Sequence, residues 1–266
     1  MSEKKITLIT GAGSGIGRAL AQEAARRGHQ LILVGRTGAR LQESAAMMGE
    51  APVTCVAADV TTPEGRAAVA AAVAAAGGRL DVLINNAGTL GVGHLSDIDD
   101  DALQRMCDTN LVAPMALTRD LLPALIAARG RVVNIGSVFG DIAYPFFAAY
   151  SATKFGLRGF SDALRRELSG RGVGVTYIAP RATSTAAESQ FAPLIDPMDM
   201  TLDSPERVAA EAWKAIAAGR RECFPRGKEK FFVRIQRMFP ALIDRAVGAQ
   251  ARDRRTLAAL EAMREA

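Results

Sequence analysis

The stretch Thr10-Gly-Ala-Gly-Ser-Gly-Ile-Gly17 follows a short apolar segment, Ile6–Thr10, and precedes a segment of helical length. Glycines between a strand and a helix permit a tight turn and let the backbone approach a pyrophosphate. The N-terminus of the helix then supplies unpaired N–H groups and a partial positive charge. The spacing is TGxxxGxG and not GxGxxG, because Ile16 stands where the latter needs glycine. A turn of this kind can also be purely structural, so other motifs must decide its role.

Five further short apolar segments follow, each separated from the next by a stretch of helical length. Strand and helix alternating at this spacing predict a parallel sheet with helices on both faces. Val, Ile and Leu run almost unbroken through the segments, as is typical of strands covered on both sides. The irregular stretch around residues 181–204 is long for a compact domain, which favours a lid over a ligand. The predicted strands are Leu31–Gly35, Val53–Ala57, Val82–Asn85, Arg131–Ile135 and Val173–Ile178.

Composition excludes several classes of protein. The 266 residues, 49% hydrophobic and 23% charged, suit one α/β domain or at most two small ones. Cys55, Cys107 and Cys223 are widely spaced and lie near neither histidine, so we expect no disulfide framework and no metal site. The N-terminus has no apolar segment, and the longest apolar run, Ala67–Ala76, is too short to cross a bilayer. We therefore expect a cytoplasmic protein without a secretory signal.

The net charge of +5 is concentrated at the C-terminus, where Arg220–Arg255 holds eleven Lys/Arg and four Asp/Glu. Residues 227–247 interleave apolar and basic side chains, which predicts an amphipathic pair of helices broken at Pro240. Such helices could lie on an anionic membrane, cover the pocket or form a subunit interface; we favour a protein contact, because basic helix faces are common. Residues 248–266 are expected to form a polar, frayed helix. We predict a main domain over 1–226 and a basic helical extension over 227–266, with no nucleic-acid partner, since no binding module is recognisable.

Further motifs stand in order at the ends of the predicted strands. Asp59-Val60 ends the third, Asn85-Asn-Ala-Gly88 ends the fourth, Asn110 falls in the next helix, Ser137 follows the fifth strand, and Tyr150-Ser-Ala-Thr-Lys154 opens the helix after it. In this order the chain closely resembles the short-chain dehydrogenase/reductase family over about residues 4–225. The resemblance implies one Rossmann-type, doubly wound domain with about seven parallel strands and a nicotinamide cofactor across the strand ends. It also implies a homodimer or homotetramer, formed through helices around Asp101–Ala127 and Ala148–Ser169.

Tyr150 and Lys154 are four residues apart and share one face of a helix. An ammonium about 4 Å from a phenol favours the phenolate by about 4 kcal/mol at an effective dielectric of about 20, which would bring tyrosine into range as a general acid/base. A YxxxK pair can be incidental on an amphipathic helix. Ser137, thirteen residues upstream, and Asn110 make the pattern specific.

The resemblance also implies roles. Tyr150 gives a proton to the substrate carbonyl oxygen, and Ser137 hydrogen-bonds that oxygen. Lys154 holds the nicotinamide ribose and lowers the pKa of Tyr150, and Asn110 anchors a water that links Lys154 to solvent. Substrate is expected to contact Ser137, Val138, Tyr144, Phe147 and Tyr150. The region around them has an apolar character that favours a hydrophobic small molecule, although several of its apolar residues could equally pack the lid or a subunit contact. These apolar residues are Tyr144, Phe146, Phe147, Phe191, Leu194 and Met198.

The second strand ends at Gly35-Arg36, where relatives that prefer NAD carry an acid. Arg36 would attract a 2′-phosphate, which favours NADP(H), although it could be a solvated arginine and Ser14 replaces the basic residue that many NADP-using relatives carry in the glycine loop. Arg181 departs from the family pattern, since it replaces a glycine that lets backbone lie near the nicotinamide. The residues expected to bind the cofactor are Gly11, Gly13, Ser14, Gly15, Ile16, Gly17, Arg36, Asp59, Val60, Asn86, Ala87, Gly88, Tyr150, Lys154, Pro180, Thr183 and Thr185.

The sequence thus predicts an NADP(H)-dependent oxidoreductase that interconverts a carbonyl and an alcohol. An NAD-dependent alcohol dehydrogenase with the same four residues is the alternative within the family. A nucleotide-binding sensor without chemistry is a third reading, against which the presence of all four residues argues.

Overall fold

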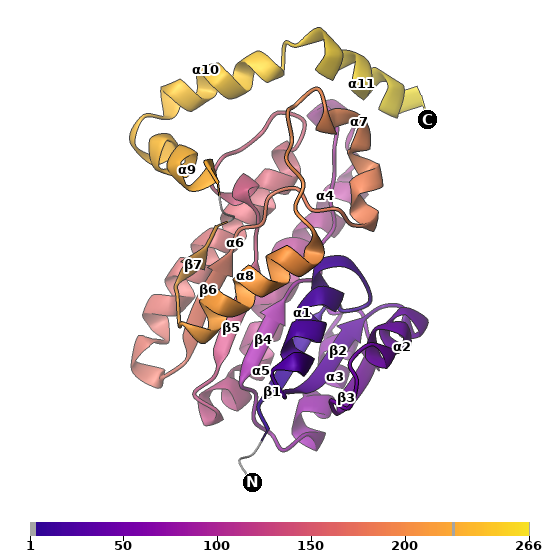
Figure 1. Ribbon diagram of the computed structural model, residues 1–266, viewed down its shortest axis with the longest axis vertical. Coiled ribbons are helices and arrows are strands. Elements are labelled where there is room, and N and C mark those ends of the chain that lie inside the picture. The colour runs from indigo at the N-terminus through magenta and orange to yellow at the C-terminus, as the bar shows by residue number, and fades with distance from the viewer. Residues whose placement is uncertain (1–3, 225–226, 266) are drawn as a thin grey trace.

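The computed structural model describes residues 4–224 and 227–265, and it contains a seven-stranded parallel sheet in the order β3-β2-β1-β4-β5-β6-β7 (Figure 1). This is the doubly wound Rossmann arrangement that the sequence predicts. The order reverses between β1 and β4, which leaves a crevice at the carboxyl ends of these two strands. The strands are β1 (Ile6–Thr10), β2 (Gln30–Gly35), β3 (Val53–Ala57), β4 (Val82–Asn85), β5 (Arg131–Ile135), β6 (Gly174–Ile178) and β7 (Glu222–Cys223).

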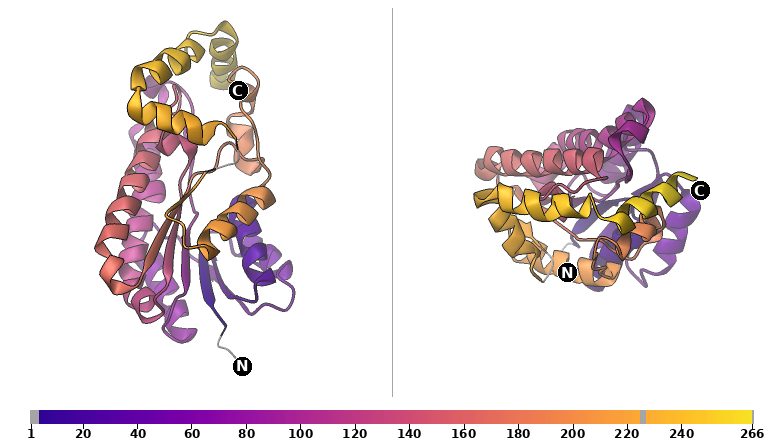
Figure 2. Two further views of the ribbon diagram at one scale, coloured as in Figure 1. Left: turned by 60° about the vertical axis from the view of Figure 1, so that its left-hand side comes forward. Right: turned by 90° about the horizontal axis from the view of Figure 1, so that it is seen from above.

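Helices cover both faces of the sheet (Figure 2). On one face α1 (Gly15–Arg26), α2 (Gly38–Ala46) and α8 (Pro205–Ala217) supply alanines and leucines to a buried cluster. On the other face, a second cluster joins the sheet to α3 (Pro63–Ala75), α5 (Ala113–Ala127) and α6 (Ala148–Glu167). The central strand β1 is buried throughout, which explains its unbroken apolar sequence.

The edge strand β7 is not among the segments that the sequence predicts. It has only two residues, Glu222 and Cys223, which pair with Tyr177 and Ile178 of β6. A strand this short has no alternation or apolar run that could distinguish it from a loop.

The lid is more ordered than its sequence indicates. A single bridge between Thr183 and Asp203 closes its base. Between them lie a short 3₁₀ segment, Ala186–Gln190, and the helix α7 (Ala192–Ile195). Phe191, Leu194 and Met198 of the lid are buried.

Three helices form a C-terminal tail that runs along the carboxyl edge of the sheet: α9 (Glu229–Met238), α10 (Pro240–Gln250) and α11 (Arg254–Glu265) (Figures 1 and 2). The expectation of a frayed helix over 248–266 is wrong for the described part of α11. Thr256 and Leu260 are buried there, and Leu260 joins the apolar cluster under the lid. Within residues 4–224 and 227–265, no helix combines the length and the apolar character that a membrane span needs.

Candidate active site

The glycine-rich turn joins β1 to α1 at the crevice. Gly11 and Gly15 have φ angles of 65° and 51°, in the left-handed region that favours glycine. At Gly17, a Cβ would lie 2.2 Å from the carbonyl oxygen of Gly11, so only glycine fits between the turn and the helix. Ser14 occupies the N-cap without a capping hydrogen bond from its side chain. The first N–H groups of α1 can therefore serve an anion.

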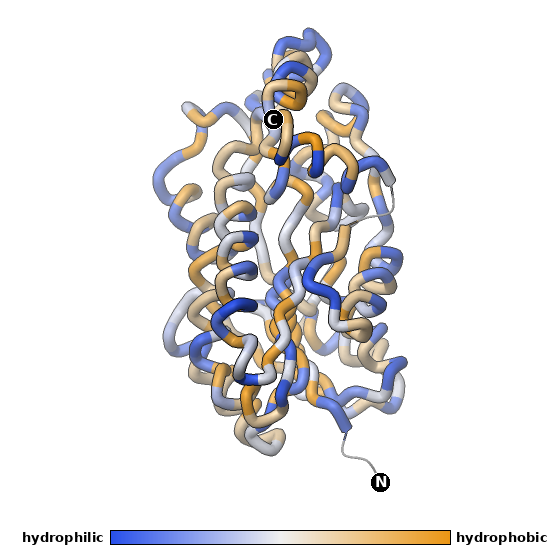
Figure 3. The backbone as a smooth tube through the Cα atoms, turned by 90° about the vertical axis from the view of Figure 1, so that its left-hand side faces the viewer, coloured by the Kyte–Doolittle hydropathy of each residue, from blue (hydrophilic) through white to orange (hydrophobic). Residues whose placement is uncertain are grey.

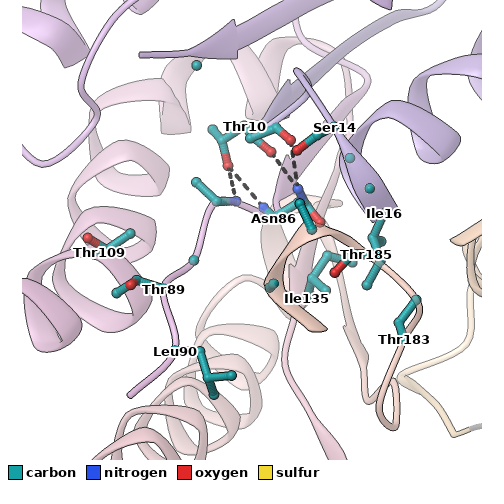
Figure 4. Close-up of a pocket in the computed structure, with 18 of the residues that line it drawn as sticks. Thr10, Ser14, Ile16, Asn86, Thr89, Leu90, Thr109, Ile135, Thr183 and Thr185 are labelled. Carbon is teal, nitrogen blue, oxygen red and sulfur yellow. Dashed lines mark hydrogen bonds between the residues drawn. The ribbon is translucent and has the colours of Figure 1, made fainter. Parts of the chain in front are cut away.

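A polar clamp fixes this turn against the end of β4 (Figure 4). The hydroxyl oxygen of Thr10 accepts hydrogen bonds from the backbone N–H groups of Asn86 and Ala87, both at 3.0 Å. The side-chain amide of Asn86 donates to the carbonyl oxygen of Thr10 at 2.9 Å. These bonds account for asparagine at the second position of the Asn85-Asn-Ala-Gly88 motif.

The turn forms one wall of a cavity of about 710 Å³ at the carboxyl end of the sheet. Every residue that the sequence predicts to bind the cofactor lines this cavity. Ser137 lines it as well, and it stands directly after β5. The backbone of five strand ends and of the base of the lid therefore lines a single cavity. We call the Thr10–Gly17 turn the glycine cradle; with it, the volume of the cavity fits an elongated nucleotide.

The last residue of β2 is Gly35 and not an acid, and Arg36 next to it and Arg40 of α2 line the cavity wall. Arg36 is exposed and faces Asp59, which lies two residues beyond the end of β3. Burial alone would raise the pKa of the Asp59 carboxyl. Hydrogen bonds from the Thr61 backbone and hydroxyl, at 2.9 and 2.7 Å, and the charge of Arg36 outweigh it and lower the pKa below its usual value.

Ser137, Tyr150 and Lys154 line the part of the cavity next to the end of β5 and the start of α6, which we call its inner end. The Ser137 hydroxyl accepts a hydrogen bond from the Phe139 N–H at 3.1 Å, which fixes the turn after β5. Tyr150 and Lys154 lie on successive turns of α6, and the Lys154 Nζ is 5.5 Å from the centre of the Tyr150 ring. The same Nζ donates to the carbonyl oxygen of Ile135 at 3.1 Å.

Burial governs the pKa values of this pair in the free chain. It raises the pKa of Tyr150 to about 12, although a hydrogen bond with Ser137 acts in the opposite direction. Burial also lowers the pKa of Lys154 from 10.5 to about 8. The expected lowering of the Tyr150 pKa is therefore not seen here, because burial of the phenol raises its pKa by more than the hydrogen bond with Ser137 lowers it. Tyr150 carries its proton at neutral pH.

Asn110 is fully buried and does not line the cavity. It lies in a π-helical turn, Asp108–Val112, between α4 (Asp100–Cys107) and α5, and such turns recur at functional sites. Its amide oxygen accepts from the Thr89 N–H at 2.8 Å, and its amide nitrogen donates to the Thr89 carbonyl at 2.8 Å and to the Thr153 hydroxyl at 3.1 Å. The side chain thus fastens the loop after β4 to α6, one residue away from Lys154.

The predicted substrate residues divide into two groups. Val138 and Phe147 line the cavity with Ser137 and Tyr150. Tyr144 does not line it; its ring stacks on Phe139 at 4.7 Å between centroids. Phe139, Leu90 and Met200 also line the cavity, although none of them is among the five residues that the sequence predicts to contact substrate. The position of Phe139, two residues after Ser137, was the signal available for it.

Arg181 adopts no left-handed backbone conformation in place of the family's glycine. Its guanidinium instead donates to Asp203 at 2.9 Å and to Glu229 at 2.6 Å. Asp203 closes the base of the lid, and Glu229 opens α9. Arg181 therefore joins a wall of the cavity to both ends of the lid and to the tail.

Loss of the Arg181 side chain, with its ion pairs to Asp203 and Glu229, should destabilise the protein. In Arg181→Gly, the Asp203 carboxylate, which is 3% exposed, loses its better-buried partner. We expect a decrease of about 2 kcal/mol in the free energy of unfolding in urea, because the buried carboxylate then keeps only the exposed Arg207 as a partner. Arg207→Gln is the matched control, since Arg207 contacts the same carboxylate from an exposed position and should matter little. Equal effects of the two variants would contradict a stabilising buried ion pair between Arg181 and Asp203.

Comparison with known proteins places this geometry in a family. The short chain dehydrogenase family profile matches residues 5–193. The chain is 38% identical over 185 residues to dehydrogenase/reductase SDR family member 7B of Bos taurus, covering 66% of this chain and 57% of that relative, so it spans little more than half of that relative's length. It is also 38% identical over 179 residues to serine 3-dehydrogenase of Agrobacterium fabrum, covering 67% of this chain and 72% of that enzyme.

Solved structures agree. A short-chain dehydrogenase from Sphingobium yanoikuyae in complex with NADPH superposes with a TM-score of 0.77 at 30% identity, covering 90% of this chain and 96% of that one. The 3-ketoacyl-(acyl-carrier-protein) reductase from Brucella melitensis, complexed with NADH, gives 0.76 at 27% identity, covering 84% and 97%. On its fold, its strand-end motifs and these matches, the chain belongs to the short-chain dehydrogenase/reductase family of oxidoreductases.

Proposed function

We propose that the protein is an NADP(H)-preferring oxidoreductase that interconverts a carbonyl and an alcohol on a hydrophobic small molecule. The observation that carries the proposal is the meeting of Ser137, Tyr150 and Lys154 at the inner end of a cavity whose outer end is a glycine cradle. The cradle accommodates a dinucleotide, and the three side chains accommodate a polarised oxygen.

A nicotinamide cofactor would supply or accept the hydride, held by the cradle and by the backbone of the Asn86–Gly88 and Pro180–Thr185 segments. In the direction of reduction, Tyr150 gives its proton to the substrate oxygen as the carbon takes up the hydride. Ser137 donates a hydrogen bond to the same oxygen and orients it. Lys154 lies close enough to favour the phenolate that remains, and its ammonium can pass a proton back to it.

The preference for NADP(H) rests on the end of β2. Gly35 offers no carboxylate to bind the ribose hydroxyls or to repel a 2′-phosphate, and Arg36 is exposed at the cavity wall. The NADPH bound to the relative from Sphingobium yanoikuyae is in line with this choice, and the NADH bound to the Brucella melitensis reductase keeps NAD(H) as the alternative.

The apolar side chains around the inner end favour a hydrophobic substrate. Val138, Phe139 and Phe147 line the cavity, as do Phe191 and Met200 of the lid. We also propose a homo-oligomer, because Val112, Met115 and Phe155 leave apolar side chains exposed on the helical face that carries α5 and α6.

The test is the oxidation of NADPH, followed by its absorbance, over a panel of aldehydes, ketones and acyl-thioesters, with NADH in parallel. We expect turnover that is faster with NADPH. Binding of cofactor without turnover of any compound in the panel would favour the alternative of a nucleotide sensor.

The cofactor preference has its own test in Arg36→Asp. A carboxylate at this position repels the 2′-phosphate and can bind ribose hydroxyls, so the ratio of kcat/KM for NADPH over NADH should fall by roughly 10- to 100-fold, the value of a charge-assisted hydrogen bond. An unchanged ratio would exclude Arg36 as the phosphate ligand. Arg171→Asp, which changes an exposed arginine that does not line the cavity, controls for the change in net charge.

A further inference from the structure

The first two tail helices leave four large apolar side chains in solvent. Phe231, Met238, Phe239 and Leu242 are between 57% and 70% exposed, and all of them fall within α9, α10 and the residue between them. Phe231 and Met238 are seven residues apart and therefore share one side of α9. Apolar exposure this dense on a short segment marks an interaction surface.

These side chains are not needed to pack the tail on the domain. The opposite sides of the two helices provide that contact, through Val233 and Ile243, which are buried with Ile142 of the loop after β5. Ion pairs from Arg237 to Asp141 at 2.7 Å and from Glu229 to Arg181 fasten α9 further. The outward side of the two helices is therefore not needed to hold the tail on the domain, as far as the described residues show.

Basic side chains are exposed on the same two helices. Lys230, Arg234 and Arg245 are exposed, and none of them forms an ion pair with a residue in 4–224 or 227–265. Residues 228–247 contain two acidic residues, of which Glu229 is half-buried and Asp244 is exposed. Hydropathy along the tail alternates accordingly between hydrophilic and hydrophobic (Figure 3). We call Phe231, Met238, Phe239 and Leu242 together with Lys230, Arg234 and Arg245 the tail patch.

We propose that the tail patch docks on an anionic lipid bilayer. A helix with cations beside large apolar residues lies in the membrane interface, its apolar residues among the acyl chains and its cations at acidic headgroups. A second copy of the chain fits less well, because a symmetric contact would set Arg234 and Arg245 against like charges. Nucleic acid would use the cations but leave the four apolar side chains in water.

The position of the tail gives this docking a defined orientation. The tail runs along the carboxyl edge of the sheet (Figure 1). Leu260 of α11 packs with Phe191 and Leu194 of the lid. The edge at which the cavity lies would therefore face the bilayer. This surface belongs to the basic amphipathic helices that the sequence predicts. We assign it a lipid partner in place of a protein contact, because large apolar side chains and cations are exposed on it together.

The experiment is co-sedimentation of the full chain with vesicles of phosphatidylcholine alone and of phosphatidylcholine mixed with phosphatidylglycerol. We expect binding to the mixed vesicles that weakens as salt is added. The pair Arg234→Glu and Arg245→Glu should lower the bound fraction by roughly tenfold or more, since each basic residue near an anionic surface contributes to binding. The pair Phe239→Ser and Leu242→Ser should lower it by a similar factor.

Matched controls lie on other surfaces. Arg171→Glu changes an exposed arginine of the main domain, and Met47→Ser changes a methionine that is 52% exposed beside α2; both should bind as the unchanged chain does. Circular dichroism verifies that every variant is folded. Absence of binding to mixed vesicles, or equal loss in the controls, would overturn the proposal. So would an oligomer that Phe239→Ser and Leu242→Ser dissociate in the absence of lipid, which would assign the patch to a contact between copies.

Discussion

Tyr150→Phe should remove almost all turnover while leaving the fold and the cavity intact. The ring remains on α6 with its neighbours, and only the hydroxyl that bonds with Ser137 is lost. A positioned general acid contributes about 10²- to 10⁴-fold to the rate, so kcat should fall by at least that factor in either direction of the reaction. Cofactor binding, followed by fluorescence of the reduced nicotinamide, should change by less than about threefold.

Two comparisons make this result decisive. Tyr144→Phe removes a phenol that stacks on Phe139 outside the cavity wall, and kcat should stay within a few-fold of the unchanged chain. Ser137→Ala removes the second donor to the substrate oxygen and should lower kcat by about 10²-fold. If Tyr150→Phe kept turnover near that of Tyr144→Phe, another group would have to supply the proton.

The parts of the fold that the sequence reveals are those in which one physical requirement acts locally. Strands covered on both faces must be apolar throughout, so β1, β2, β4 and β5 could be located to within a residue. The Thr10–Gly17 turn needs glycine for its backbone angles and for the close approach of Gly17 to Gly11. These needs are visible in the order of residue types.

The parts that the sequence conceals depend on contacts between distant segments. The pairing of Arg181 with Glu229 joins positions 48 residues apart, and it cannot be read from the replacement of a single glycine. α11 looks polar in sequence, because only a few of its residues, such as Thr256 and Leu260, are buried. The engagement of Asn110 with Thr89 and Thr153 also follows from the packing of two helices and a loop, not from any motif.

Lys154→Met should abolish turnover and stabilise the free chain at the same time. Lys154 is 5% exposed, and burial lowers its pKa from 10.5 to about 8. That difference corresponds to about 3 kcal/mol spent on keeping the ammonium in the interior at neutral pH. Methionine has a similar length and no charge, but it leaves the Ile135 carbonyl without its donor at a cost of about 1 kcal/mol. We expect the free energy of unfolding in urea at pH 7 to rise by about 2 kcal/mol.

The pH dependence distinguishes this cause from a change in packing. Below pH 8 the folded and unfolded chains both carry a protonated Lys154, so the penalty of burying the charge is present in full. Between pH 8 and 10.5 the folded chain gives up this proton first, the unfolded chain holds more protons, and the unchanged protein gains stability. The advantage of Lys154→Met should therefore shrink as the pH rises through this interval. An advantage that is independent of pH would mean that better packing, and not removal of a buried charge, stabilises the variant.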